Sequence, residues 1–498
     1  MDTVHALPVE LWAHILEFIP QEDLKTMRLT HRIFWACATS IVWHRLTLCN
    51  PLTEKTEKAK RILENPHLAR HVTHLRLHPI NWVIADKVEP WANAWLSTAP
   101  ILSVLNWAHP ILSWRYYHQS LESIKVAAEV TPLLIHVREI TVIVNLDDMK
   151  LDLEALPLEP YRATWAGLRT ECLQRLNLKL ATVEATQIVS GAIKSASPVV
   201  FESLHTLTLD LGVRSRAYPQ LQGDLRTILD CGRSSLRTLG FTIGSTATNY
   251  FAEVVGAFGV FPNLAQFHFE KSTCQNEAYT RSLKLVLLPF LFKHRSTLKK
   301  LHLSLLHFPS TLQTLFEHNE YDDTTLSLEA FTLGYWSWSD KSRMTSFQRF
   351  ADTLTHLMLI PKFGNHAWVY EDVKMLLDSL RRPVGGIGLK GLSLRVWAIS
   401  PDLLDLLAGC LTNLERLQLD YGRIAASKDQ KNKDDLVLFF RTMGPRSYPL
   451  WGLRCLDARP YFVRQDWIPA AFFRRIIPSL EEVGVIDWGD GEVTLGPW

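Results

Sequence analysis

The chain has 498 residues, of which 47% are hydrophobic and 21% charged, so it is long enough for several domains or one long repeat domain. Its formal net charge of only +2 gives no global reason to expect nucleic acid or an anionic membrane as a partner. The longest apolar run is too short to span a bilayer, and the N-terminus lacks the basic and apolar regions of a signal peptide. We therefore expect a cytoplasmic or nuclear protein without a structural metal or other cofactor, since the seven cysteines show no C-x-x-C spacing.

The first expected element is a helix that begins at Leu7 or Pro8. Proline suits a first helical turn because its missing N–H would be unpaired there, and Glu10 follows where the helix dipole favours a negative charge. This helix has apolar residues on more than one face: a stripe of Leu11, Ile15, Phe18 and Ile19, and outside it Val9, Trp12 and Leu16. Two more short helical patterns follow before residue 50. A compact unit of three helices with a surplus of apolar surface is expected.

From about residue 134 a six-residue phrase recurs, with hydrophobic residues at its first, fourth and sixth positions. An example is "LKKLHL", which starts at 298. Its copies start at 137, 173, 204, 236, 264, 298, 328, 354, 389, 414, 453 and 480, while "VTHLRL" at 72 stands apart from this series. The eleven intervals between these starts cover 343 residues and average about 31, slightly above the usual range for leucine-rich repeats. The last three positions alternate as in a strand with one buried face, and segments such as 280–294 and 369–382 have the pattern of amphipathic helices.

These patterns predict an α/β fold in which each unit is a strand and a returning helix. No unit buries its apolar face alone, so neighbours are expected to stack into an irregular solenoid with parallel strands on the concave side and helices on the convex side. The expected organisation is a helical unit at 1–49, a linker with capping or divergent repeats at 50–133, and a leucine-rich-repeat solenoid at 134–498. The mixed-charge segment 427–435 is predicted to be a solvated insertion.

The order L-P-x-E at 7–10, Ile15-Leu16, Leu24, Leu29, and Trp43 with Leu46 resembles the F-box. With the repeats, the chain is similar to the F-box and leucine-rich-repeat family of fungal type. In that family the F-box binds a Skp-type adaptor, which joins it to a cullin ubiquitin ligase, and the repeats hold the protein to be ubiquitinated. The resemblance departs at His31, where many family members have cysteine.

The resemblance implies an adaptor-binding surface formed by Leu7, Pro8, Ile15, Leu16, Leu24 and Trp43. A three-helix unit of about forty residues is too small to bury so many apolar side chains in its own core. Some of them are therefore expected to form a binding site for a partner protein. The alternative is a helical cap that seals the first repeat.

A G-x-G-x-x-G pattern occurs at Gly386, Gly388 and Gly391, which elsewhere holds a dinucleotide. Here the glycines run into a repeat strand and do not open a helix, so a tight turn into the strand is the better interpretation. His268 and His302 are expected to be neighbours on adjacent strands, with Glu270 one step along. These side chains are metal ligands elsewhere, but open repeat strands rarely preorganise such a site, and polar surface is favoured.

The candidate target-binding residues lie between the core positions of the strands, on the expected concave face. Fixed cations on a curved sheet suit an acidic or phosphorylated segment. The alternative for Arg395, Asp420 and Arg459 is that they pair with one another. A second anchor is the aromatic segment at 334–338, for which packing of a loop is an equal alternative. The predicted set is Gln266, His268, Lys300, His302, His356, Arg395, Arg416, Arg459, Trp336 and Trp338.

The family resemblance and the repeats together predict a non-catalytic substrate receptor of a Skp-cullin-F-box ligase, whose partners are the adaptor, through it a cullin, and a target protein. No pattern of a nucleophile elbow or paired acid and base residues indicates an enzyme. Two alternatives remain. One is a repeat scaffold that binds the adaptor without directing degradation, and the other is a nucleotide-dependent enzyme that uses the motif at 386–391.

Overall fold

The computed structural model divides the chain into two compact units, Met1–Leu264 and Ala265–Trp498. It describes residues 7–48, 54–77, 125–144, 162, 164–168, 172–180, 189–191, 193–211, 219–244, 255, 259–271, 286–305, 326–335, 347–361, 367–382, 386–428, 436–461, 468 and 470–484. Among these residues, no helix is long and apolar enough to cross a membrane.

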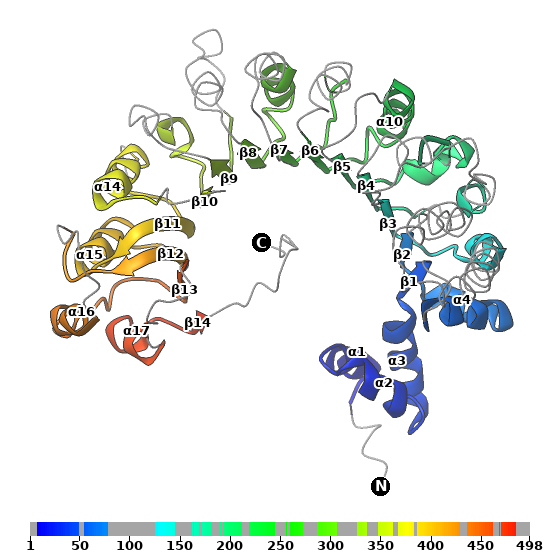
Figure 1. Ribbon diagram of the computed structural model, residues 1–498, viewed down its shortest axis with the longest axis horizontal. Helices are drawn as coiled ribbons and strands as arrows, with labels where there is room; N and C mark the ends of the chain where they lie inside the picture. Colours follow the sequence, from blue (N-terminus) through cyan, green and yellow to red (C-terminus); the bar gives the residue numbers. More distant parts are fainter. Residues whose placement is uncertain are drawn as a thin grey trace, which may run out of the picture. The chain divides into compact units, whose positions relative to one another are not determined.

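The first unit opens with three helices, α1 (Val9–Glu17), α2 (Gln21–Met27) and α3 (Arg32–Trp43), as the sequence predicts (Figure 1). α1 begins directly after Pro8 and α2 directly after Pro20. The ring of His31 caps α3, since its Nδ1 accepts a hydrogen bond from the backbone N–H of Ile33 at 3.1 Å. His31 therefore has a structural role at the start of the third helix.

A parallel sheet follows the three helices in the first unit. Its strands lie in chain order, each parallel to the next: β1 (Arg45–Leu48), β2 (His74–Leu77), β3 (Glu139–Val144), β4 (Arg175–Leu180), β5 (Thr206–Leu211) and β6 (Thr238–Ile243). The described helical segments between them include α4 (Glu54–Glu64), η2 (Pro66–His71), η4 (Thr131–Leu133), η6 (Pro198–Phe201) and α10 (Pro219–Cys231). The sheet thus begins at β1, well before residue 134, and the isolated phrase at 72 contributes the second strand.

The second unit continues the same strand-and-helix alternation (Figure 1). Its strands are β7 (Gln266–Lys271), β8 (Lys300–Leu305), β9 (Ala330–Tyr335), β10 (His356–Pro361), β11 (Gly391–Ile399), β12 (Arg416–Ile424), β13 (Cys455–Pro460) and β14 (Glu482–Gly484). Among its described residues, the helices include α14 (Tyr370–Ser379), α15 (Pro401–Cys410), α16 (Leu436–Met443) and α17 (Ala470–Ile476), and residues 286–293 are also helical. These elements confirm the helices that the sequence predicts within 280–294 and 369–382.

The repeat phrase determines where the strands lie. From β3 to β14, each strand begins two residues after the first hydrophobic position of a phrase. In the phrase at 298, Leu298, Leu301 and Leu303 are 1%, 4% and 0% exposed, so all three apolar positions enter the core. Because neighbouring strands run parallel and helical segments lie in most of the described connections between them, the architecture is that of a solenoid-like repeat.

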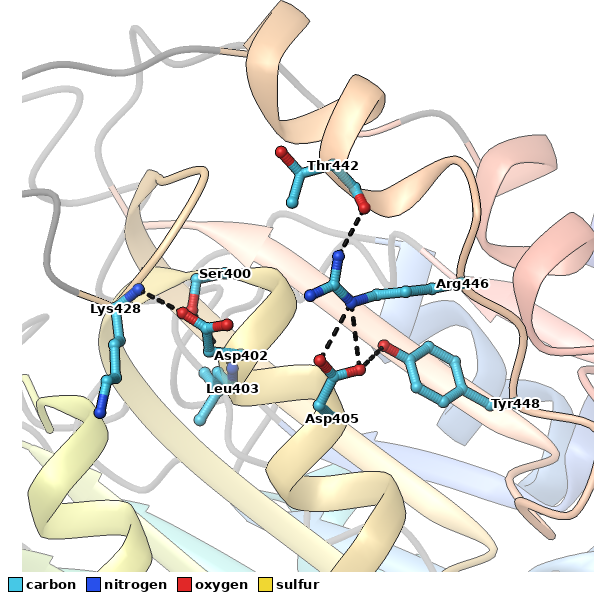
Figure 2. Close-up of polar contacts among 8 residues, drawn as sticks. All are labelled: Ser400, Asp402, Leu403, Asp405, Lys428, Thr442, Arg446 and Tyr448. Carbon is cyan, nitrogen blue, oxygen red and sulfur yellow. Dashed lines mark hydrogen bonds and ion pairs between the residues drawn. The ribbon is translucent and has the colours of Figure 1, made fainter.

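In the second unit, α14, α15, α16 and α17 cover one face of strands β10 to β14 (Figure 1). On the opposite face the described residues form no helix, and we call this the open face. Polar contacts link α15 to the segment that follows α16: Asp405 of α15 accepts hydrogen bonds from the Nε of Arg446 at 3.0 Å and from the hydroxyl of Tyr448 at 2.7 Å (Figure 2). Ser400 caps α15 by accepting from the N–H of Leu403.

Candidate binding surfaces

The three N-terminal helices carry a concentration of exposed apolar side chains. Seven of the fifteen exposed large apolar side chains in the described part of the chain lie here, which we call the apolar helix surface: Leu7, Val9, Leu11, Ile15, Phe18, Leu29 and Trp35. Phe18 and Leu29 are 77% and 78% exposed. So many exposed apolar side chains on one small unit favour a protein-binding site.

The side of α1 that packs in the core of the helical unit is not the stripe of Leu11, Ile15, Phe18 and Ile19 that is most continuous in the sequence. Leu16 is 0% exposed, and the Trp12 ring meets the Phe34 ring of α3 edge to face, with centroids 4.9 Å apart. Leu11 and Ile15, by contrast, face solvent at 49% and 41% exposure. Two apolar stripes on one short helix leave one of them without a partner inside this unit.

The six residues predicted to bind an adaptor therefore fall into two groups. Leu7, Pro8 and Ile15 are exposed, whereas Leu16, Leu24 and Trp43 are 0%, 2% and 4% exposed. The buried three hold the helices together and offer almost no surface for contact. Sequence reasoning did not select Phe18, Leu29 or Trp35, although Phe18 belongs to the same stripe as Ile15 and Leu29 belongs to the motif.

On the open face of the second unit, His268 and His302 lie opposite each other in the register of β7 and β8, as predicted. Their rings stack with centroids 4.0 Å apart, and the Nε2 of His268 lies 3.6 Å from an oxygen of Glu270. Gln266 lies opposite Lys300 in the same register. Within the described residues, no three His, Cys, Asp or Glu side chains converge to hold a metal ion.

Arg395, Asp420 and Arg459 are adjacent in the register of β11, β12 and β13. Arg395 lies 3.8 Å from Asp420, whereas Arg459 forms a two-point contact with Asp457 on its own strand. Burial raises the pKa of Asp420, although the two nearby arginines act in the opposite direction. Both arginines therefore face carboxylates of the same sheet. This pairing reduces their attraction for an anion from another molecule.

Aromatic residues form the next row beyond these arginines, and the sequence analysis did not select them. The guanidinium of Arg395 lies 5.0 Å from the ring centre of Tyr461, and that of Arg423 lies 5.6 Å from the ring centre of Trp397. Trp397 is 39% exposed. The sequence does contain a signal for these residues. Residues two apart on a strand lie on the same face, and Trp397 follows Arg395 by two residues, as Tyr461 follows Arg459.

The glycine motif is a turn into a strand, as predicted. Gly386 has a φ of +76°, which glycine adopts without strain, and Gly391 is the first residue of β11. No helix starts at these glycines. The predicted aromatic anchor, Trp336 and Trp338, lies outside the described residues, as does most of the expected insertion at 427–435.

Two comparisons with known proteins bear on this chain. A scan against protein-family models finds no match, and a search of curated proteins finds none.

Proposed function

We propose that the protein is the substrate-recognition subunit of a Skp-cullin-F-box ubiquitin ligase. The helical unit binds the adaptor, and the repeats bind the protein to be ubiquitinated. The observation that carries the proposal is the apolar helix surface, which the folded unit does not use for its own core. The order of motifs in the sequence supplies the identity of the partner, since Leu7, Ile15 and Leu29 of this surface also belong to the pattern that resembles an F-box.

The exposure of the side chains supports an interface on the helices in two ways. Phe18 and Leu29 are large and almost fully exposed, and burial of each stabilises a complex by about 2 kcal/mol. Aromatic residues such as Trp35, at 48% exposure, are common anchors of protein interfaces. A helical cap that sealed a repeat would have its large apolar residues buried within this chain.

In this role the chain performs no bond chemistry. The ubiquitin thioester is carried by another subunit, and the receptor raises the local concentration of a target lysine near it. The parallel sheet suits this task because it presents a row of variable side chains on an extended open face.

The experiment is a pull-down of the full chain from cell extract, read out for a Skp-type adaptor and for a cullin. The double variant Leu7→Ala, Pro8→Ala removes exposed apolar contact and the helix start together, and we expect it to lose the adaptor. The matched control is Val437→Ser, which removes a side chain of 79% exposure from α16 in the second unit and should change nothing.

Each outcome separates the alternatives. Retention of the adaptor by the Leu7, Pro8 variant contradicts the F-box assignment. Adaptor without cullin, and no protein whose half-life changes when the chain is deleted, supports the scaffold. Nucleotide binding that is lost in Gly388→Ala would instead support the enzyme.

A further inference from the structure

The first row of side chains on the open face of the second unit alternates charged or titratable residues with very small ones. The register of β8 to β12 aligns Lys300, Ala330, His356, Gly391 and Arg416, and we call this set the basic row. Between β8 and β12 it contains no carboxylate, and the same register continues through Cys455 of β13 to Glu482 of β14. Lys300 and His356 are half-buried and Arg416 is exposed, so all three are accessible from the open face.

Gly391 leaves room for the imidazole of His356, whose Nδ1 lies 2.9 Å from the hydroxyl of Thr355. A Cβ on Gly391 would approach the Cδ2 of His356 to 2.5 Å and its Nε2 to 3.3 Å. The ring therefore leans across the neighbouring strand, over Gly391, and toward Arg416 on the strand after it. The third glycine of the G-x-G-x-x-G pattern thus has a role that is unrelated to nucleotides, because it makes room for an imidazole beside a guanidinium.

The charges around the basic row are largely compensated. The residues that precede each strand pair across neighbouring repeats: Lys299 with Glu329 at 2.7 Å, Lys390 with Glu415 at 3.3 Å, and Arg454 with Glu481 at 3.9 Å. Farther along the strands, Arg395 and Arg459 face Asp420 and Asp457. The basic row lies between these two zones, and three of its five residues are basic.

The environment of His356 agrees with this distribution of charge. The pKa of His356 is lowered, first by burial and then by Lys300 and Arg416. Lys390 adds a smaller effect in the same direction, and Glu415 opposes it. The imidazole thus lies in positive surroundings that disfavour its own protonation.

We propose that the basic row binds an acidic segment of the target protein, which crosses strands β8 to β12 in extended conformation with carboxylates against Lys300, His356 and Arg416. This inference rests on the proposed function, since it names the chemistry of the target. Four strand spacings of about 4.8 Å give a span of about 19 Å, which about six extended residues cover.

The spread of the three residues favours several carboxylates over one phosphate group. Lys300 and Arg416 are four strands apart, so a single phosphate contacts one end of the row at a time. Separate carboxylates along a segment reach all three residues at once. Ala330 between Lys300 and His356 leaves the backbone of such a segment room to approach the sheet.

Binding of this kind is coupled to pH through His356. A carboxylate beside the ring favours the imidazolium form and opposes the effects of Lys300, Lys390 and Arg416. The complex therefore takes up a proton, and its affinity rises as the pH falls from about 8 to about 6, where glutamate stays ionised. In His356→Gln this dependence on pH is lost.

The test measures the binding of a labelled all-glutamate peptide of about eight residues to the full chain, by fluorescence anisotropy at low salt. We expect Lys300→Gln and Arg416→Gln each to weaken binding by about tenfold, which is the loss of one charge-assisted contact. Lys299→Gln is the matched control, because it removes an adjacent lysine that pairs with Glu329, and it should leave affinity unchanged. Gly391→Ala displaces the imidazole and should reduce the pH dependence without loss of affinity at pH 8.

The inference is overturned if the all-glutamate peptide does not bind, if an all-glutamine peptide binds equally well, or if Lys299→Gln weakens binding as much as Lys300→Gln. Tighter binding of a peptide with one phosphoserine and no other acidic residue also overturns it, in favour of a phosphate site. Adaptor binding measured on the same proteins separates the two proposals: adaptor without peptide refutes the basic row alone, and peptide without adaptor refutes the ligase role alone.

Discussion

The three N-terminal helices and the repeats of the second unit differ in how completely they bury their apolar side chains. In the repeat at 298 the apolar residues of the phrase are at most 4% exposed, whereas Phe18 and Leu29 in the helical unit exceed 75%. A repeat buries its apolar face against the next repeat. A unit of about forty residues, by contrast, has too small a core to bury all of its apolar side chains. The helices therefore expose apolar side chains, whereas the open face of the second unit carries polar and charged ones.

The largest expected effect comes from a charge placed in the stacked core of the repeats. Leu301→Asp in β8 puts a carboxylate at a position of 4% exposure, and we expect a loss of stability on the order of 4 kcal/mol or more, with more than one repeat unfolding. Urea unfolding followed by circular dichroism and limited proteolysis measures it. Lys300→Gln on the same strand is the control and should be nearly neutral. An unchanged unfolding curve for Leu301→Asp would show that this repeat is not stacked between its neighbours.

A second pair of variants contrasts the two stripes of α1. Leu16→Ala removes a side chain of 0% exposure and should destabilise the helical unit by about 2–5 kcal/mol. Phe18→Ala removes a larger side chain that is 77% exposed, so stability should change by less than about 0.5 kcal/mol while adaptor binding weakens. Thermal unfolding of both variants, together with adaptor pull-down, checks the contrast. Equal destabilisation would mean that Phe18 belongs to the core and that the helices lack a spare apolar face.

A smaller effect is expected on the helix-covered side of the second unit. The hydroxyl of Tyr448 donates to Asp405, and burial, followed by that carboxylate, raises the pKa of Tyr448 so that the hydroxyl keeps its proton (Figure 2). Tyr448→Phe should cost about 1 kcal/mol of stability, since it removes one partly exposed hydrogen bond and keeps the ring. Chemical denaturation measures the loss, and Asp405→Asn is the second variant, which also weakens the contact with Arg446. A neutral result for both would show that this contact does not help to hold α15.

The smallest effect is a dependence of stability on pH in the first unit. The pKa of Glu139 is lowered below its ordinary value of 4.5, chiefly by the hydrogen bond and charge of His74, with Arg175 and Arg45 adding to it. The folded state then binds fewer protons than the unfolded state between the two pKa values, so this stabilisation is present above about pH 5 and is lost as the pH falls through the folded pKa. Glu139→Gln should flatten the stability profile in that acid range. A parent profile that is already flat there would contradict the contribution of Glu139.

The repeat phrase predicted the strands from β3 to β14 because its spacing places three apolar residues in the core of every repeat. It did not predict β1, although Trp43, Leu46 and Leu48 have the same spacing and are at most 5% exposed. Tryptophan replaces the first leucine there, and Trp43 was assigned to a partner surface. The spacing of the phrase, more than the identity of its first residue, decides where a strand enters the sheet.

The side-chain surfaces were only partly predictable. Periodicity shows which residues of α1 share a face, but it cannot decide which face is inward when both are apolar, as Leu11 and Leu16 show. Register correctly placed Arg395 beside Asp420, yet the partner of Arg459 is Asp457, two residues earlier on the same strand. The position of the His356 ring over Gly391 depends on the rotamer, and no pattern in the sequence specifies a rotamer.

The most direct test of the central claim is size-exclusion chromatography with light scattering on the purified full chain mixed with a purified Skp-type adaptor. We expect a one-to-one complex for the parent chain and no complex for Phe18→Ser, Leu29→Ser, which makes the two most exposed residues of the apolar helix surface polar while the core stays intact. Separate elution of the parent chain and the adaptor, or an unchanged complex with the double variant, would contradict it.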